Sequence, residues 1–455
     1  MGQGHHERAL AGLRSAYAAL PATEPIRLAK PSSNLFRFRA PAASPGLDVS
    51  DFTHVLAVDP QARTADVQGM TTYERLVDAT LPHGLMPHVV PQLKTITLGG
   101  AVTGLGVEAS SFRNGLPHES VREMEILTPG GGIVTAAPGG EHDELFHAFP
   151  NSYGTLGYAL RLLIDLEPVR PYVRLRHLRF TDAQSCLDTL ARVGETATHE
   201  SEPVDFVDGA AFTRDELFLT LATFVDEAPA VSDYTGQHIY YQSIQRLGRL
   251  GRDDYLTVRD YLWRWDTDWF WCSRAFGVQR PWVRRLVPRR YLRSDVYWKL
   301  IALDRRYGLS QRADRVRGQH GREPVIQDVE VPVERAAEFL DFFHSEIGIA
   351  PVWMCPLRSR KSWPLYPLNP RTLYVNFGFW STVPLAAGQS EGTYNKRIEE
   401  VVTELGGHKS LYSTSYFDEH DFWDLYNGEA YGRVKRTYDP HGRLLDLYDK
   451  TVLAR

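Results

Sequence analysis

The sequence has few cysteines, no long apolar run and no excess of positive charge, and each absence excludes a class of protein. The 3 cysteines, Cys186, Cys272 and Cys355, stand far apart, which fits neither a disulfide framework nor a zinc site and favours a reducing cytoplasm. No stretch approaches the roughly 20 apolar residues of a membrane-spanning helix. A net charge of -5 argues against a nucleic-acid partner. We therefore expect neither an integral membrane protein nor a nucleic-acid-binding protein.

The chain is long enough for two domains, since 455 residues exceed what one hydrophobic core ordinarily serves. Its composition, with 43% hydrophobic and 24% charged residues, is ordinary for a globular protein. The composition changes after Val169-Arg170-Pro171, where aromatic residues and strand-like alternation become frequent. We predict one domain at 1–171 and a second at 172–455, with the C-terminal segment returning to the first.

A glycine-rich stretch at residues 97–111 is the most unusual local feature. It is too apolar for a flexible linker and too rich in glycine for an ordinary helix. Glycine allows unusual backbone angles and close approach, and hydroxyl side chains can hydrogen-bond phosphate or carbonyl oxygens. The stretch therefore predicts either the bed of a large cofactor or a tightly turned buried hairpin. The residues with these properties are Gly99, Gly100, Gly104 and Gly106, with Thr97, Ser110 and Ser111.

The elements around this stretch follow a definite order. They are a polar turn at 30–34, strands at 55–59 and 64–69, a helix at 71–83, the glycine-rich stretch, strands at 121–127 and 133–137, a helix at 143–148 and a buried strand at 157–166. An amphipathic helix is expected within residues 1–20. The second half alternates strands, such as 204–208, 218–223 and 372–377, with helices such as 333–347, which predicts an α+β domain.

With this order, the first half resembles the flavoproteins built on the vanillyl-alcohol-oxidase, or PCMH-type, FAD-binding domain. The resemblance implies an α+β protein with a PCMH-type domain of two α/β subdomains and an α+β substrate, or cap, domain. It also implies that the early turn holds the FAD pyrophosphate and that the glycine-rich stretch lies along the flavin. The implied cofactor residues are Ser32, Ser33, Asn34, Leu35 and Phe36, then Thr97, Gly99, Gly100, Gly104, Gly106, Ser110 and Ser111.

The sequence departs from many of these flavoproteins in one respect. Those relatives attach the flavin covalently through a histidine or cysteine in the two loops, and neither residue occurs at 30–36 or 97–111. Bound FAD is therefore expected to be non-covalent.

The second half resembles more narrowly the Δ24-sterol reductase branch of this family. The similar segments are residues 325–332, 349–357 and 404–412, together with 104–111 and 154–157 in the first half. This resemblance implies reduction of an isolated carbon–carbon double bond in a lipid, with FAD as cofactor and NADPH as reductant.

The substrate expected from this resemblance is a methylene-branched fatty acyl chain, reduced to a methyl branch as in 10-methylstearate. The Arg-, Ala- and Gly-rich composition suggests a bacterium of high GC content, where sterol synthesis is rare, and a bacterial branch of these reductases acts on such chains. Three alternatives are a Δ24-sterol reductase, an FAD-dependent alcohol or sugar oxidase or dehydrogenase of the same fold, and a non-catalytic lipid-binding protein.

An unconjugated alkene cannot simply accept hydride, so the site needs a proton donor and an apolar wall near the resulting tertiary cation. The candidate donors are Glu108, in the glycine-rich stretch, and His320. Glu108 could instead only accept hydrogen bonds, and His320 could be an ordinary loop residue. Candidates for the wall of the substrate channel, or alternatively for core packing, are Trp353, Tyr374, Phe377 and Trp380.

Residues 261–298 contain six tryptophans. Within this segment, seven arginines between Arg274 and Arg293 follow one another with no acidic residue among them. This pattern predicts a surface that meets anionic lipid headgroups, so the protein is expected to lie peripherally at the inner face of a bacterial membrane. An aromatic core segment with a solvated basic flank, or a phosphate clamp for a nucleotide, would give the same pattern. The arginines are Arg274, Arg280, Arg284, Arg285, Arg289, Arg290 and Arg293.

Overall fold

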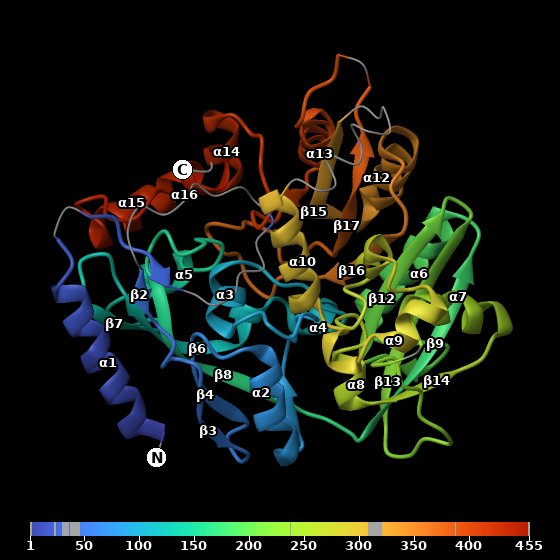
Figure 1. Ribbon diagram of the computed structural model, residues 1–455, viewed down its shortest axis with the longest axis horizontal. Coiled ribbons are helices and arrows are strands. Elements are labelled where there is room, and N and C mark those ends of the chain that lie inside the picture. The colour runs from blue at the N-terminus through green and yellow to red at the C-terminus, as the bar shows by residue number, and fades with distance from the viewer. Residues whose placement is uncertain are drawn as a thin grey trace.

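The computed structural model describes residues 2–21, 24–29, 36, 46–236, 238–307, 321–386 and 388–453. The chain is α+β, as predicted, with two sheets that follow one another along the sequence (Figure 1). The first sheet ends with a strand that reaches Pro168, and the second begins at Tyr172. The domain boundaries at 171 and the two subdomains of the first half stay predictions.

The first sheet has the strand order β3-β4-β8-β6-β7, with β5 beside the end of β8, and its paired strands are antiparallel. The predicted strand pairs, helices and buried strand of this half are confirmed. Its elements are α1 (Gly2–Ala18), β1 (Leu28–Ala29), β2 (Leu47–Asp48), β3 (Val55–Asp59), β4 (Thr64–Gln68), α2 (Tyr73–Thr80), β5 (Leu85–Pro87), α3 (Leu98–Thr103), α4 (Ser111–Asn114), β6 (Val121–Leu127), β7 (Ile133–Ala136), α5 (Asp143–Ala148) and β8 (Tyr158–Pro168).

The second sheet is antiparallel throughout, with the strand order β14-β9-β13-β12-β16-β17-β15-β18. Its strands are β9 (Tyr172–Phe180), β12 (Phe206–Thr213), β13 (Glu216–Val225), β14 (Asp254–Thr257), β15 (Arg322–Pro332), β16 (Val352–Leu357), β17 (Tyr374–Pro384) and β18 (His408–Lys409), with a separate pair β10 (Thr198–His199) and β11 (Glu202–Pro203). The helices between them are α6 (Ala183–Thr196), α7 (Tyr240–Leu250), α8 (Val258–Leu262), α9 (Pro281–Leu286), α10 (Ser294–Tyr307), α12 (Ala336–Phe342) and α13 (Thr393–Glu404).

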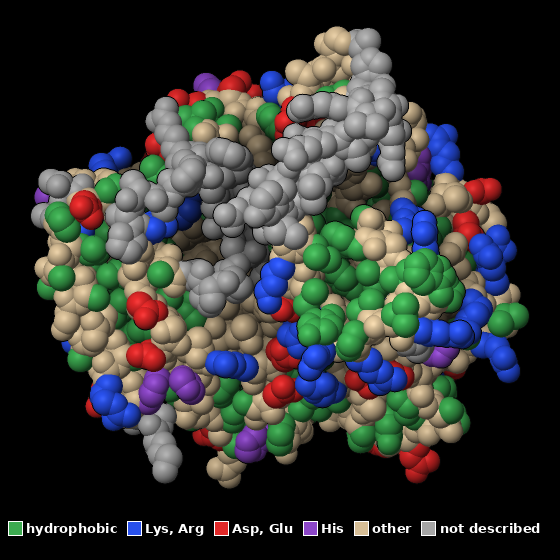
Figure 2. Space-filling view, in the orientation of Figure 1, with side chains coloured by type: hydrophobic (Ala, Val, Ile, Leu, Met, Phe, Trp, Pro, Cys, Tyr) green, Lys and Arg blue, Asp and Glu red, His purple; other side chains and the backbone are tan. Residues whose placement is uncertain are grey.

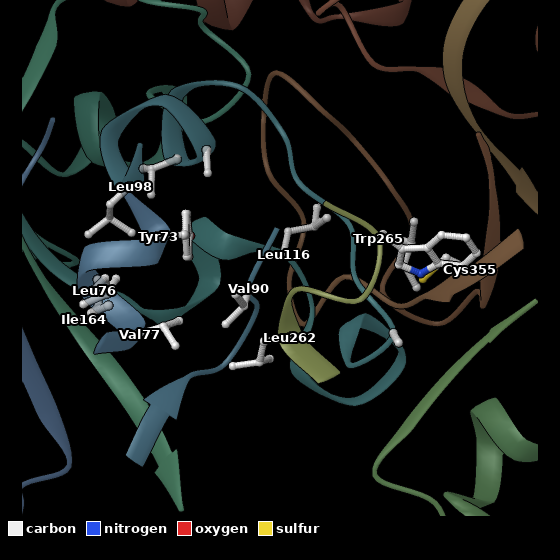
Figure 3. Close-up of a cluster of buried hydrophobic side chains, with 14 of the residues drawn as sticks. Tyr73, Leu76, Val77, Val90, Leu98, Leu116, Ile164, Leu262, Trp265 and Cys355 are labelled. Atoms are coloured by element: carbon white, nitrogen blue, oxygen red, sulfur yellow. The ribbon is translucent and has the colours of Figure 1, made fainter. Parts of the chain in front are cut away.

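The two faces of the second sheet have different surroundings. Side chains of one face pack with α6, α12 and α13 in a separate hydrophobic core. Side chains of the other face join the core of the first half, and Figure 3 shows this continuity from Tyr73 of α2 through Leu116 to Trp265 and Cys355. The face of the second sheet that is turned towards the first half is therefore the place for a site between them.

The C-terminal helices α14 (Glu419–Leu425), α15 (Gly428–Tyr438) and α16 (Leu447–Thr451) lie beside α5 rather than on the second sheet (Figure 1). Lys435 Nζ donates to the Thr155 carbonyl at 2.9 Å, and Lys450 Nζ donates to that of Tyr153 at 2.8 Å. The end of the chain is thus bonded to the first half. No helix in the described ranges is long and apolar enough to cross a membrane.

Candidate active site

The glycine-rich stretch forms a short helix followed by an extended segment, so the hairpin alternative is wrong. Thr97 caps α3 by accepting a hydrogen bond from the Gly100 N–H at 3.2 Å. After α3, the chain runs without regular structure to Glu108 and then turns into α4.

Gly99 and Gly69 allow α3 to pack directly on the first sheet. The Gly99 N–H donates to the Gly69 carbonyl at 2.8 Å, and a Cβ at Gly99 would lie 2.7 Å from that oxygen. A Cβ at Gly69 would lie 2.0 Å from the Ala159 carbonyl of β8. No side chain fits at either position, so packing explains Gly99, and its predicted contact with a cofactor stays a prediction.

The three hydroxyl groups of the stretch that were predicted to meet a cofactor have partners within the chain. Thr97 caps α3, Ser110 Oγ donates to the His88 carbonyl at 2.8 Å, and Ser111 Oγ accepts from the Glu108 N–H at 3.0 Å. These bonds fix the path of the stretch. Whether the same hydroxyls also meet a cofactor stays a prediction.

The segment just after α3 presents backbone groups to a ligand. Within the described part of the chain, no hydrogen bond joins the N–H groups of Leu105, Gly106 and Val107 to other residues, although all three residues are half-buried. A Cβ at Gly104 would lie 3.3 Å from the ring of Tyr153, which bounds this segment on one side.

The turn at 151–157 adds a second set of such groups. Asn151, Tyr153 and Gly154 have φ angles of 61°, 49° and 75°, and turns with left-handed residues direct backbone N–H groups into anion-binding concavities. The Tyr153 N–H donates to the Thr103 carbonyl at 2.7 Å, which holds the turn beside the end of α3. Among the described residues, Asn151 Oδ1 and Ser152 Oγ are buried without a hydrogen-bond partner.

These groups fit FAD, a large ligand with many polar atoms. Buried polar atoms are normally hydrogen-bonded, yet Glu108 Oε2 and both amide atoms of Gln92 also have no partner in the part of the chain that the structure describes. Together with the segment 105–107 and the turn at 151–157, they provide hydrogen-bonding groups that have no partner within the described chain and are available to a ligand.

Glu108 belongs to a buried ion cluster that joins the two halves of the chain. Arg264 Nη2 lies 3.2 Å from Glu108 Oε1 and 2.9 Å from Asp208 Oδ2. The indole N–H groups of Trp265 and Trp353 each donate to the same Asp208 oxygen at 3.2 Å. One fully buried guanidinium therefore balances two carboxyl groups, of which Asp208 accepts most of the donors.

The surroundings keep Glu108 protonated to unusually high pH. Burial raises the pKa of Glu108 to about 7, while Arg264 lowers it and the nearby Asp208 raises it. A carboxyl group that is protonated near neutral pH, with one oxygen unbonded, is suited to act as a general acid.

A row of mostly polar side chains crosses the second sheet on the face turned towards the first half. Strand register places Thr220 between His177 and Asp208, and Asn376 between Cys355 and Glu330. The neighbouring Gly209–Met354 pair sets Asp208 beside Cys355. We call this the polar row; its members are His177, Thr220, Asp208, Cys355, Asn376, Glu330 and His408.

Two acidic residues of β15, Asp328 and Glu330, extend the site and were not predicted. Burial raises the pKa of Asp328 to about 6, while Asn376 and Tyr412 lower it by hydrogen bonding. Burial raises the pKa of Glu330 to about 8, although the Tyr366 hydroxyl donates to it. Asp328 and Glu330 are two residues apart and alternate with Val329 and Val331, so they share one face of the strand, and this alternation was the available signal.

The predicted channel residues divide between the two faces of the sheet. Trp353, Tyr374 and Trp380 lie on the face of the polar row, where Trp380 donates to the Tyr412 hydroxyl at 3.0 Å. Phe377 lies on the opposite face, fully buried with its ring 4.7 Å from that of Phe339. Strand alternation therefore separates Phe377 from the other three, and its assignment to the channel is corrected to core packing.

Of the early turn, Phe36 alone falls within the described residues. Its ring lies 4.4 Å from that of Trp298 and 5.6 Å from that of Trp269, and its N–H donates to the Tyr412 carbonyl at 2.9 Å. This links the early turn to aromatic residues of the second half. Ser32, Ser33, Asn34, Leu35 and the candidate donor His320 lie outside the described residues.

The tryptophan-rich segment is chiefly core. Four of its tryptophans are buried, and Trp282 is the most exposed, at 63%. Arg284, predicted as part of a basic surface, is also buried, and it pairs with Asp268 at 2.6 Å. The aromatic-core alternative therefore holds for Trp263, Trp265, Trp269 and Trp271.

A match to a known family model shows which class of protein this is. Residues 33–137 match the family model of an FAD binding domain, so the region that contains α3 and the glycine-rich stretch is an FAD-binding domain of the PCMH type. The predicted resemblance to flavoproteins of the vanillyl-alcohol-oxidase type is confirmed.

The relatives that match most of the chain are Δ24-sterol reductases. The chain is 26% identical over 447 residues to that of Arabidopsis thaliana, covering 90% of this chain and 77% of the relative. It is 25% identical over 413 residues to that of Homo sapiens, covering 88% and 76%. A decaprenylphosphoryl-β-D-ribose oxidase of Mycolicibacterium smegmatis is 31% identical over 123 residues, covering 27% and 26%. The protein thus contains an FAD-binding domain and is related to the Δ24-sterol reductases over most of its length.

Proposed function

We propose that this protein uses NADPH and non-covalent FAD to reduce an isolated carbon–carbon double bond in a lipid, a methylene-branched fatty acyl chain. Two carboxyl groups of raised pKa carry the reaction type, Glu108 on the glycine-rich stretch and Asp328 on the second sheet. Glu108 shares Arg264 with Asp208, to which the indole of Trp353 donates, and Asp328 is hydrogen-bonded to Tyr412, to which the indole of Trp380 donates. Relationship to Δ24-sterol reductases over most of the chain supports the same reaction type.

The chain would hold FAD at the segment 105–107 and the turn at 151–157, where unbonded N–H and side-chain groups gather. When bound, FAD supplies the hydride that completes the reduction. In the described residues of the predicted loops, 36 and 97–111, no histidine or cysteine is present to attach it, which supports non-covalent binding.

Protonation of the alkene is the task of the protein's own side chains. A carboxylic acid delivers its proton to the less substituted carbon, and positive charge develops on the more substituted carbon. Besides the predicted donor Glu108, the structure adds Asp328 as a candidate, whereas both oxygens of Glu330 accept hydrogen bonds, from Tyr366 and Ser410. Glu108 has a higher pKa than Asp328, and Asp328 is the less buried of the two. The faces of Trp353 and Trp380 stabilise developing positive charge, and their bulk keeps water from capturing it.

The preference for an acyl chain over a sterol rests on the bacterial character of the composition. Both substrates present an unconjugated alkene with one disubstituted carbon, so the same acid and aromatic wall serve either. Reduction of a sterol side chain is the second candidate, because that is the named activity of the relatives.

Anaerobic turnover distinguishes these candidates. In the first step, protein loaded with FAD is mixed with NADPH or NADH, and bleaching of the flavin absorbance band is followed. In the second step, the reduced protein is mixed with micelles of methylene-branched phospholipid or, separately, of desmosterol, and the return of the flavin band is followed. We expect bleaching by NADPH and reoxidation by the phospholipid, with a methyl-branched product. Reoxidation by desmosterol alone would overturn the substrate assignment. Failure of both lipids, with bleaching of the flavin by an alcohol or a sugar and rapid reoxidation by oxygen or a quinone, would favour an oxidase or dehydrogenase.

A further inference from the structure

Half of the large hydrophobic side chains that are exposed in the described residues gather on one surface. Trp282 and Leu286 are 63% and 76% exposed on α9, Tyr291 is 45% exposed in the turn that follows, and Leu300 is 42% exposed on α10. Trp282 and Leu286 are four residues apart, so they share one side of the helix. We call these four residues the α9–α10 patch; Figure 2 shows hydrophobic side chains gathered over this part of the molecule.

Positive charge surrounds the patch. No acidic residue occurs between Cys272 and Ser294, whereas seven arginines do. Arg284 and Arg293 turn inward to ion pairs, with Asp268 and with Glu74. The other five are exposed, and among them Arg289 has an ion pair with Asp233 in the described part of the chain; they are Arg274, Arg280, Arg285, Arg289 and Arg290.

The inner side of the same segment reaches the candidate active site. The ring of Phe270 lies 4.4 Å from that of Trp380 and 5.5 Å from that of Trp353. Residues 269–271 therefore pack against the aromatic wall, and the chain continues from them into the exposed patch. The segment that ends in the patch therefore begins at the aromatic wall of the candidate active site.

We propose that the α9–α10 patch docks the protein on an anionic lipid bilayer, from which it takes its substrate. A tryptophan and a tyrosine suit the bilayer interface, a leucine inserts among acyl chains, and arginines bind lipid phosphates. Pairing of the patch with a second copy is disfavoured, because a two-fold contact would bring the same arginines together. The inference rests on the proposed function in taking the substrate to be a lipid, but docking itself is independent of turnover.

Vesicle flotation of the FAD-loaded protein tests the docking. The vesicles contain phosphatidylcholine alone or equal parts of phosphatidylcholine and phosphatidylglycerol. We expect binding to the anionic vesicles that weakens with salt. Replacing three arginines by glutamate, in R280E/R285E/R290E, should lower the partition coefficient by about a hundredfold, since each contributes about tenfold or less. W282S/L286S should lower it by about tenfold or more.

Matched controls keep the test specific. R14E/R122E/R335E reverses three exposed charges on other elements, and L445S/L453S removes two exposed leucines near the C-terminus. Both controls should bind like the unaltered protein. Equal binding by R280E/R285E/R290E and its control would overturn the proposal, as would a dimer that W282S/L286S converts to monomer.

Activity measurements separate this inference from the proposed function. With substrate in non-ionic micelles, R280E/R285E/R290E should turn over at the unaltered rate, and with substrate in anionic vesicles it should be slower in proportion to lost binding. Normal docking without reduction of either lipid would contradict the proposed function and leave the docking surface intact. Normal reduction from vesicles by a variant that no longer docks would contradict the docking surface alone.

Discussion

Arg264 and Glu108 form an ion pair of 3.2 Å that connects the substrate half of the chain with the glycine-rich stretch of the FAD-binding half. Arg264 also meets Asp208 at 2.9 Å and lies over the ring of Tyr261, 4.0 Å from its centroid. Because these groups are excluded from water, the guanidinium is the counter-charge for Asp208, and for Glu108 whenever Glu108 is ionised.

Removing this guanidinium should destabilise the protein. R264M leaves Asp208 and Glu108 buried without a cation, which costs about 3–5 kcal/mol in the free energy of unfolding. R264K keeps the charge but cannot reach both carboxyl groups in the same geometry, so its loss should be smaller. Urea unfolding followed by tryptophan fluorescence measures both. Equal stability of R264M and the unaltered protein would show that the cluster is not held by charge.

The proton donor can be identified by replacing each carboxyl group with its amide. If Glu108 is the acid, E108Q should bind FAD and accept electrons from NADPH normally, but reduce the alkene about a hundredfold to ten-thousandfold more slowly. D328N replaces the carboxyl group of the other candidate, Asp328, by an amide of the same shape, and it should slow alkene reduction less than E108Q does. The two half-reactions are followed separately by stopped-flow absorbance. A slow alkene step in D328N and a normal one in E108Q would reverse the assignment.

Arg284 and Arg285 are neighbours in the sequence, but one is buried and the other exposed, so their variants can be compared directly. Arg284 Nη1 and Nη2 reach the two Asp268 oxygens at 2.6 and 2.9 Å within the core, whereas Arg285 is exposed. R284Q should therefore cost about 3–5 kcal/mol of unfolding free energy, because Asp268 loses its partner. R285Q should lie within about 0.5 kcal/mol of the unaltered protein. Denaturant midpoints for the two variants check this, and similar losses would contradict the assigned burial.

Local signals in the sequence were sufficient for much of the fold. The apolar spacing of α2, and the alternation in β3, β4, β6 and β8, predicted elements that the structure confirms. Such signals depend on neighbouring residues, whose periodicity is visible in the chain. The FAD-binding class likewise followed from the order of these elements around the glycine-rich stretch.

The candidate site was harder to predict because it depends on contacts between distant residues. Glu108 could be singled out by its position, but its partner Arg264 stands 156 residues further on, within a segment interpreted as a surface. The polar row arises from register between seven strands, which no local pattern encodes. Phe377 was misplaced because the face on which a strand residue lies depends on the sheet around it.

Close backbone packing at Gly99 makes a sharp prediction. In G99A the new Cβ would lie 2.7 Å from the Gly69 carbonyl, so α3 must move away from β8 and the segment 105–107 with it. We expect a loss of several-fold or more in FAD affinity together with lower thermal stability. G12A, on α1, places its Cβ where nothing lies within 4 Å and serves as the control. FAD binding is measured by flavin fluorescence quenching, and unchanged binding by G99A would separate α3 from the cofactor bed.

The buried carboxyl group of Glu330 should make the stability of the protein depend on pH. Its pKa rises from 4.5 to about 8 on folding because of burial, so between these values the folded state holds a proton that the unfolded chain has released. Stability should therefore fall as the pH rises through this window, by up to about 1.4 kcal/mol per pH unit from this group.

Glutamine at this position cannot ionise, so E330Q should flatten the decline between pH 4.5 and about 8. E338Q, at an exposed carboxyl group paired with Arg335, should leave the slope unchanged. Urea midpoints measured across the window provide the comparison. If E330Q and the unaltered protein lose stability in parallel, then Glu330 is already ionised in the fold, and the Tyr366 hydroxyl that donates to it outweighs the cost of burial.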